Sequence, residues 1–286
     1  MSQYSEVEPV ETKLTGSKLK ESNLKGSNLK GSKVAESKPT SSVPIETGAV
    51  GVYGKIPAHG DFVSRRLSPD FIRYWDEWLQ RSVSVSQEQL GDRWLDYYLV
   101  SPIWRFVLSP GVVDESGWAG VLLPSVDNVG RYFPLTIAMP VKAPSLMDFF
   151  VQGEDWFQQV EASALAALHE SLSIEELNDR VLANSCKIGV DYSSKRVGGE
   201  PGGALQFDMK PEQCPSALFP LMFEQLVRQQ YRSYSAWWSQ GSEKIVPSFN
   251  LTAQLPDASM YASFLDGDWE QRGWQKPYDF FDAKII

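Results

Sequence analysis

The sequence predicts an α+β fold in which a central, mostly antiparallel sheet is flanked by helices. Two observations support this prediction. Apolar residues follow a helical period in three separate stretches, starting near residues 69, 154 and 219. Between and after these stretches the period changes to two, in short runs separated by turn residues. Strands that follow one another through short turns favour antiparallel pairing.

The first 48 residues differ in composition from the rest and predict a disordered tail. They consist mainly of Ser, Lys, Glu, Thr and Gly, and they contain a five-residue repeat, SKLKE, SNLKG, SNLKG and SKVAE, from Ser17. The spacing is similar to that of pentapeptide-repeat solenoids, but a solenoid needs several stacked units and this run would make about one coil. We therefore expect a disordered tail over 1–48. One α+β domain is expected over 49–286, with a possible junction near Asn184.

The folded part is expected to begin with GVYGKIPAHGDFVSRR, residues 51–66. Its apolar start suits a short strand, and its glycines and proline then divide it into a tight loop. Polar side chains on such a loop are a modest indication of function. The polar residues of interest are Lys55, His59, Asp61 and Arg65. We expect them on or beside the loop rather than in a core, with His59 and Asp61 hydrogen-bonded to the loop's own backbone.

A helix is predicted to follow this loop. Ser68 can cap it, and Pro69 suits its first position. Five aromatic or aliphatic residues at helical spacing form one apolar stripe, which is more often core than a ligand platform. These residues are Phe71, Tyr74, Trp75, Trp78 and Leu79. A second short helix is predicted over 94–99.

Three strands are predicted next, over 104–108, 118–123 and 132–139. The last two are joined by a turn over 127–130, where Gly130 suits a left-handed conformation. Pro134 cannot donate to a strand ladder, which favours an edge strand or a bulge at that position.

The C-terminal half continues with helices and strands. Helices are predicted over 154–168, 174–181, 219–231 and 260–265, with Ser173 and Glu176 forming a capping box. Strands are predicted over 205–207, 235–239 and 249–255, and an exposed loop over 193–203. Because neighbours on a strand face opposite sides, one of Trp237 and Trp238 is expected in the core and the other partly exposed. Trp238 is the candidate interface anchor.

Composition excludes several classes of partner. The formal net charge is −9, and the first 48 residues hold seven Lys and six Glu, so the acidity belongs to the folded part. An acidic surface argues against nucleic acid or anionic lipid as the main partner. No apolar run approaches the ~18 residues of a membrane span, and no signal peptide is recognised. The chain has only two cysteines, Cys186 and Cys214, which imply no disulfide framework and favour a reducing compartment. We therefore expect a cytoplasmic protein.

The sequence offers little catalytic chemistry. His59, Asp61 and Ser64 could serve as base, orienting carboxylate and nucleophile of a hydrolase, but residues so close on a tight loop rarely reach triad geometry. The Gly54-Lys55 pair lacks the other residues of a phosphate loop. The histidines and cysteines are scattered without metal-ligand spacing. We therefore expect no catalytic residue, cofactor or metal, and a hydrolase using His59 and Asp61 stays as an alternative.

Several motifs stand in one order along the chain. They are Gly-Lys-x-Pro-x-His-Gly-Asp-Phe from Gly54, a Trp-rich helix, Trp-Arg-Phe from Trp104, and Pro-Ser-x-Asp-x-x-Gly-Arg-x-Phe-Pro-Leu from Pro124. Together they resemble the TagF (ImpM) family of type VI secretion system accessory proteins. The resemblance runs from about Val50 to about Gly267 and is densest before Val141.

The resemblance implies a post-translational repressor of type VI secretion. Such a protein acts by binding the cytoplasmic forkhead-associated scaffold protein of that system, with a functional link to its Ser/Thr kinase and phosphatase. The candidate partner-binding residues are Lys55, His59, Asp61, Arg65, Ser125, Asp127, Arg131 and Trp238. An Asp127–Arg131 ion pair that pins the turn is the simpler explanation for those two. We expect the 55–65 and 125–131 segments to converge at one end of the sheet. An adaptor for another cytoplasmic partner is a further alternative.

Overall fold

The computed structural model describes residues 43–44, 46–142, 146–184, 186, 189–190, 207, 209 and 211–276. Within Ser41–Ile286 the contacts group into one compact unit. Most of the predicted tail lies outside the described residues, but its last part contains β1 (Val43–Pro44) and β2 (Glu46–Thr47). The loop predicted over 193–203, and residues 205 and 206 of a predicted strand, also lie outside the described residues.

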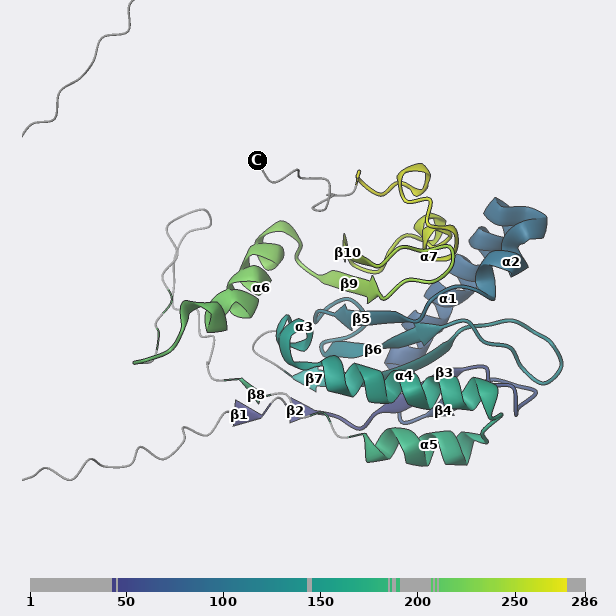
Figure 1. Ribbon diagram of the computed structural model, residues 1–286, viewed down its shortest axis with the longest axis horizontal. Helices are drawn as coiled ribbons and strands as arrows, with labels where there is room; N and C mark the ends of the chain where they lie inside the picture. Colours follow the sequence, from purple (N-terminus) through teal and green to yellow (C-terminus); the bar gives the residue numbers. More distant parts are fainter. Residues whose placement is uncertain are drawn as a thin grey trace, which may run out of the picture. The chain divides into compact units, whose positions relative to one another are not determined.

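An eight-stranded antiparallel sheet forms the middle of the molecule (Figure 1). Besides β2 it contains β3 (Gly51–Gly54), β4 (Val63–Arg65), β5 (Trp104–Leu108), β6 (Gly117–Leu123), β7 (Leu135–Lys142), β9 (Tyr234–Ser239) and β10 (Ser248–Ala253). The strand order is β10-β9-β5-β6-β7-β3-β4, and β2 pairs with β7. A separate two-stranded ladder joins β1 to β8 (Gly189–Val190). The predicted fold class is confirmed.

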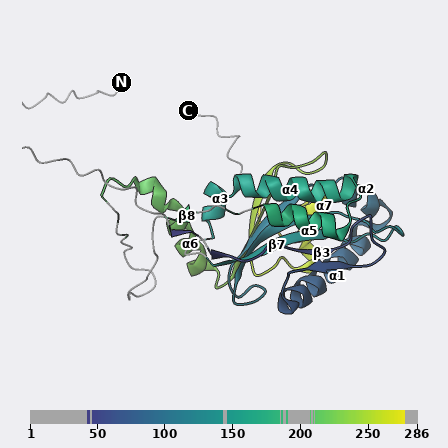
Figure 2. The same cartoon turned by 90° about the horizontal axis from the view of Figure 1, so that it is seen from below.

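Helices cover both faces of the sheet. One face carries α3 (Asp148–Gln152), α4 (Glu154–His169), α5 (Ile174–Ala183) and α6 (Phe219–Gln230). The other carries α1 (Pro69–Leu90), α2 (Trp94–Tyr98) and α7 (Ser263–Asp266). Short 3₁₀ turns lie at Gly91–Arg93, Pro215–Leu218, Ala258–Met260 and Glu270–Arg272. Figure 2 shows α4 and α5 on one side of β3 and β7, and α1 on the other.

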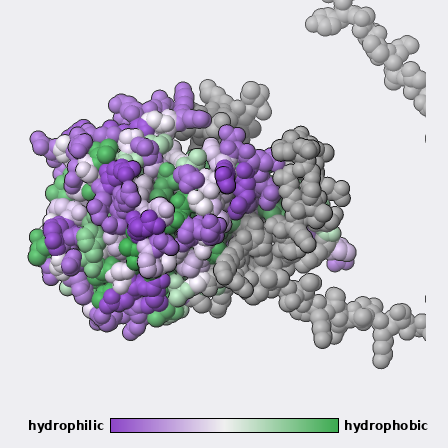
Figure 3. Space-filling view, turned by 180° about the vertical axis from the view of Figure 1, so that it is seen from behind, coloured by the Kyte–Doolittle hydropathy of each residue, from purple (hydrophilic) through white to green (hydrophobic). Residues whose placement is uncertain are grey.

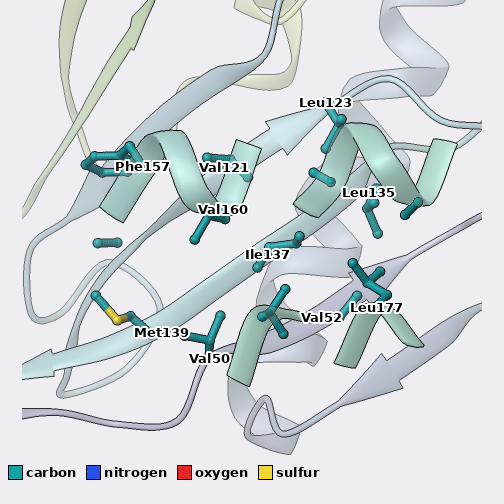
Figure 4. Close-up of a cluster of buried hydrophobic side chains, with 14 of the residues drawn as sticks. Val50, Val52, Val121, Leu123, Leu135, Ile137, Met139, Phe157, Val160 and Leu177 are labelled. Carbon is teal, nitrogen blue, oxygen red and sulfur yellow. The ribbon is translucent and has the colours of Figure 1, made fainter. Parts of the chain in front are cut away.

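Alternation along the strands divides the interior into two cores. Trp237 is fully buried in the α1-side core, while its neighbour Trp238 is half-buried on the α4 side, as predicted. The α1-side core is aromatic, with the ring of Trp75 6.0 Å from that of Trp237. The α4-side core is mainly aliphatic, with Ile137 of the sheet beneath α4 and Leu177 of α5 (Figure 4).

One buried guanidinium ties α4 to the sheet. Arg105 of β5 donates from Nε to Glu161 at 2.6 Å and from Nη1 to Glu154 at 2.6 Å. Burial lowers the pKa of Arg105, but the bonds to the two carboxylates outweigh this effect and raise the pKa above its usual value. The Trp-Arg-Phe motif therefore places its aromatic residues in one core and its arginine beneath the opposite helix layer.

The predicted helix starts near residues 69, 94, 154, 174 and 219 are confirmed, whereas the helix predicted over 260–265 is α7, which begins only at Ser263. Ser68 Oγ accepts a hydrogen bond from the amide of Phe71 at 3.1 Å, and Ser173 and Glu176 form the capping box. Tyr74 was expected in the buried stripe but is 46% exposed. It lies at the margin of the stripe, where the guanidinium of Arg73 covers its ring at 4.3 Å. The other four stripe residues are buried.

The prediction of an edge strand or bulge at Pro134 is wrong. β7 begins one residue later, at Leu135, and pairs with β6, β3 and β2. Because Pro134 precedes the strand, its missing N–H costs the ladder nothing. Its carbonyl oxygen approaches Gly54 so closely that a Cβ there would lie 2.1 Å away, and Gly54 has a φ of +131°. Only glycine fits where the first loop leaves β3.

The outer face of α1 is polar. Arg81 pairs with Glu77 at 3.1 Å on this helix, and both side chains are exposed. Figure 3 shows the side opposite to Figure 1, where hydrophilic residues predominate and hydrophobic areas are small and scattered. No helix in the described part of the chain combines the length and apolar character needed to cross a bilayer.

Candidate functional site

The two motif segments meet, as predicted. We call residues 55–66 the motif loop and residues 125–131 the motif turn. The amide of Asn128 donates to the carbonyl oxygen of His59 at 3.0 Å, and Ser125 Oγ donates to that of Lys55 at 2.7 Å. The guanidinium of Arg131 donates to the carbonyl oxygen of Gly60. Backbone and side-chain bonds therefore join residues 55–60 of the motif loop to the whole of the motif turn.

The carboxylate of Asp127 is the centre of this junction. Its side chain is completely buried, and Oδ2 accepts from Lys55 Nζ at 2.5 Å and from Arg131 Nε at 2.7 Å. Oδ1 accepts from the amides of Val129 and Arg131, at 3.0 and 2.8 Å. Burial raises the pKa of Asp127, but these hydrogen bonds, led by that from Lys55, hold it well below its usual value. The predicted Asp127–Arg131 ion pair is confirmed.

Lys55 was expected outside the core, and this expectation is wrong. The residue is 4% exposed, and its ammonium lies between the Asp127 carboxylate and the ring of Phe62, whose centroid is 4.9 Å from Nζ. A buried ammonium is tolerated where a carboxylate compensates its charge. The sequence shows no local pattern that links residues 72 positions apart, which is why the pair was missed.

Helix α2 holds the first residue of the motif turn, Ser125, through Tyr98. Tyr98 Oη donates to the carbonyl oxygen of Ser125 at 3.0 Å and accepts from the amide of the same residue at 2.9 Å. Tyr98 and Ser125 are both buried. The turn is thus held at Ser125 by α2, and at Asn128 and Arg131 by the motif loop.

Helix α5 is attached to the motif loop by its first turns. Nε2 of His59 accepts a hydrogen bond from the amide of Ile174 at 3.3 Å, and Arg65 pairs with Glu175 at 3.0 Å. The prediction that His59 bonds its own loop is wrong, because Ile174 offers one of the unpaired amides of a helix N-terminus. The prediction for Asp61 is confirmed, since its Oδ1 accepts from the amide of Phe62 at 2.8 Å.

The residues considered for hydrolysis do not form a catalytic arrangement here. The His59 side chain bonds α5, the Asp61 side chain bonds its neighbour's amide, and Ser64 lies on β4. Among the described residues, no hydrogen bond joins any two of these three side chains. Over the same part of the chain, no group of three or more His, Cys, Asp or Glu is placed to hold a metal ion.

Above the buried junction lies an exposed surface, which we call the motif surface. Its members are Asp61, Phe62, Val129 and Arg131, whereas Arg65 is exposed on the α5 side of the sheet, where it pairs with Glu175. Phe62 is 42% exposed, and its ring packs edge-on against Phe133 with centroids 4.8 Å apart. Val129, at the tip of the turn, is 66% exposed. Neither of these two apolar residues was among the predicted candidates; Phe62 stands in the Gly-Asp-Phe motif, whereas nothing in the sequence pointed to Val129.

Trp238 lies apart from the motif surface. It is on β9, where its ring contacts Phe157 of α4 and Phe150 of α3, with centroids 4.9 and 4.7 Å apart. The structure thus brings together seven of the eight candidate residues and places Trp238 in the packing beneath α3 and α4. Of the seven, Lys55, Ser125 and Asp127 are buried.

Fold and site together define a three-layer α+β domain with an exposed surface built on a buried ion-pair junction. Comparison with known proteins makes the class specific. The family model of the TagF N-terminal domain, described as type VI secretion system-associated, matches residues 51–183. The crystal structure of PA0076 from Pseudomonas aeruginosa PAO1 is similar, with 33% sequence identity, a TM-score of 0.67, and coverage of 81% of this chain and 98% of that chain. Among curated proteins there is no match.

The chain therefore belongs to the TagF family, and the resemblance found in the sequence is confirmed. The family-model match contains the motif loop, the motif turn and α5. It ends before α6, β9 and β10, so the far edge of the sheet lies outside it.

Proposed function

We propose that this chain is a non-catalytic repressor of type VI secretion that acts after translation. It binds the cytoplasmic forkhead-associated scaffold protein of that system through the motif surface. Family membership supports the link to type VI secretion. The observation that carries the binding role is the Lys55–Asp127–Arg131 junction, which uses the polar motif residues to hold an exposed surface in place.

The composition of the motif surface suits protein recognition. Interfaces depend on a few anchors, usually aromatic residues and arginines, surrounded by contacts of smaller effect. Phe62 supplies an aromatic anchor, and Arg131, which is bonded to the carbonyl oxygen of Gly60, supplies an exposed guanidinium group of the kind that suits carboxylates or phosphates. A surface fixed before binding loses little entropy when the partner docks. Occupation of the scaffold by this chain would prevent its assembly with the secretion machinery, and the kinase and phosphatase of the system would set when that happens.

A pull-down from the native cell tests this proposal. The baits are the full chain, a Val129→Asp variant, and a matched Val151→Asp control. Val129 and Val151 are similarly exposed, at 66% and 68%, but Val151 lies on α3, which follows the opposite end of β7. We expect the wild-type and Val151→Asp baits to recover the scaffold, and the Val129→Asp bait to lose it. Equal recovery by all three would move the interface elsewhere. Recovery by none would overturn the proposal.

A further inference from the structure

The outer edge of β10 lacks the features that normally protect a sheet edge. Ser248–Ala253 reads SFNLTA, without a charge or a proline, although 22% of the chain is charged. Among the described strands, none pairs with this edge. Exposed edges are usually short or carry charges, because their unpaired amides attract other strands. The opposite edge follows this rule, since β4 has three residues and contains Arg65.

Hydrogen bonds to β9 show which groups of β10 point outward. The amide of Gln254 donates to the carbonyl oxygen of Ser233 at 3.0 Å. Because backbone groups alternate along a strand, the N–H and C=O groups of Phe249, Leu251 and Ala253 point away from β9. The side chains of these three residues face the α3 and α6 side, where the ring of Phe249 lies 5.1 Å from that of Phe150.

We propose that β10 pairs with β10 of a second copy of this chain, antiparallel, about a two-fold axis through Leu251. The axis is perpendicular to the sheet, so the two sheets become one. In this register Leu251 lies opposite Leu251 of the partner subunit, and Phe249 lies opposite Ala253 of the partner subunit. Each pair can exchange two backbone hydrogen bonds, because these residues carry the outward amides.

The edge is complementary to itself, which favours a second copy over another occupant. The large ring of Phe249 lies opposite the small methyl group of Ala253 of the partner subunit, and the two copies of Leu251 meet on the axis. On the other face Asn250 lies opposite Thr252 of the partner subunit, a polar pair. A two-fold interface requires this kind of self-matching. A charged peptide would find no counter-charge on the strand. Two copies, each with a net charge of −9, would meet along a segment that carries none.

Helix α6 offers further apolar area on the same face of the sheet. It packs through Val227 near Tyr234, yet it also exposes a second apolar row at i, i+4 and i+7. These residues are Phe219, Phe223 and Leu226. In the two-fold pair both α6 helices, each with this exposed row, lie on the same side of the joined sheet.

Sedimentation velocity of the full chain and of a Leu251→Pro variant tests the pairing. Proline at this position removes an N–H that points away from β9, so it blocks the partner and spares the intramolecular ladder. We expect a dimer for the wild type and a monomer for Leu251→Pro. A wild-type chain that stays monomeric at every concentration would overturn the proposal, as would a Leu251→Pro variant that stays folded and dimeric.

Cysteine cross-linking tests the register even if the proline variant folds poorly. In a Cys186→Ser, Cys214→Ser background, Leu251→Cys faces its own copy at a Cα separation of about 5.5 Å, which suits a disulfide. Under mild oxidation it should form a covalent dimer. Asn250→Cys is the matched control and should not, whereas Asn250→Cys combined with Thr252→Cys should. Cross-linking of Asn250→Cys alone, or none with Leu251→Cys, would refute the register.

Discussion

Lys55 Nζ lies 2.5 Å from Oδ2 of Asp127, and both side chains are buried where the motif loop meets the motif turn. Two motifs that are distant in the sequence thus form one structural unit. The Gly-Lys motif supplies the cation, and the Pro-Ser-x-Asp motif supplies the anion. Three of their polar residues, Lys55, Ser125 and Asp127, lie below the surface, and they position the exposed residues that are available to a partner.

Loss of the ammonium should destabilise the junction. Lys55→Met keeps most of the side-chain volume but leaves the buried Asp127 carboxylate with Arg131 as its only charged partner in the junction. We expect a fall in Tm of roughly 5–10 °C by differential scanning calorimetry, because breaking a buried pair from one side is costly. The matched control is Arg81→Met, which breaks an exposed pair with Glu77 and should change Tm by at most about 2 °C. Equal shifts in the two variants would contradict a buried junction.

The Asp127 carboxylate should make stability depend on acid pH. Its pKa in the folded state is held well below the ordinary 3.8. The contribution of Asp127 to the unfolding free energy is therefore complete when the pH is well above the ordinary pKa of 3.8. It is lost as the pH falls through 3.8 toward the lower folded-state pKa. Urea unfolding between about pH 5 and pH 2 should show a shallower loss of unfolding free energy in Asp127→Asn than in the wild type. Asn128→Ala, which removes no titratable group, should keep the wild-type slope; parallel curves for Asp127→Asn and wild type would refute the prediction.

The link between β5 and α4 should require an arginine. Arg105→Lys keeps the charge but cannot bond Glu154 and Glu161 together through a planar fork. We expect a loss of about 2 kcal/mol in unfolding free energy. Arg180→Lys, in an exposed pair with Glu170, should cost less than about 0.5 kcal/mol. A neutral Arg105→Lys would show that the guanidinium geometry is unimportant.

The capping box should hold the start of α5 against the motif loop. Ser173→Ala removes the acceptor of the Glu176 amide and should cost about 1 kcal/mol. Amide hydrogen exchange should accelerate in the first turn of α5. Ser84→Ala, at an exposed position inside α1, is the control and should leave stability unchanged or slightly higher. Unchanged exchange at Glu176 would contradict the role of the cap.

Features that depend on a few neighbouring residues could be predicted from the sequence. Ser68 and Ser173 cap helices, and Trp237 and Trp238 face opposite cores, because capping and strand alternation are local rules. The ion pair between Asp127 and Arg131, four residues apart, is of the same kind. The convergence of the two motif segments was inferred from their place in the family pattern and is confirmed.

The missed features depend on tertiary contacts. Burial of Lys55 depends on a carboxylate 72 residues away, and the acceptor role of His59 depends on where α5 docks. The prediction of an edge strand or bulge at Pro134 failed because the register of β7 with β3 and β6 decides where this strand begins. The edge position of β10 follows from a strand order that no local pattern encodes.

The most direct test of the proposed function is the affinity of the purified full chain for the purified forkhead-associated scaffold, measured by isothermal titration calorimetry. We predict binding by the wild type and a loss of affinity of at least tenfold in Phe62→Ala, since truncation of an aromatic anchor costs about 1.4 kcal/mol or more. Val151→Asp should bind like the wild type. No heat of binding from a folded wild-type chain, or equal affinity for wild type and Phe62→Ala, would contradict the claim that the motif surface binds the scaffold.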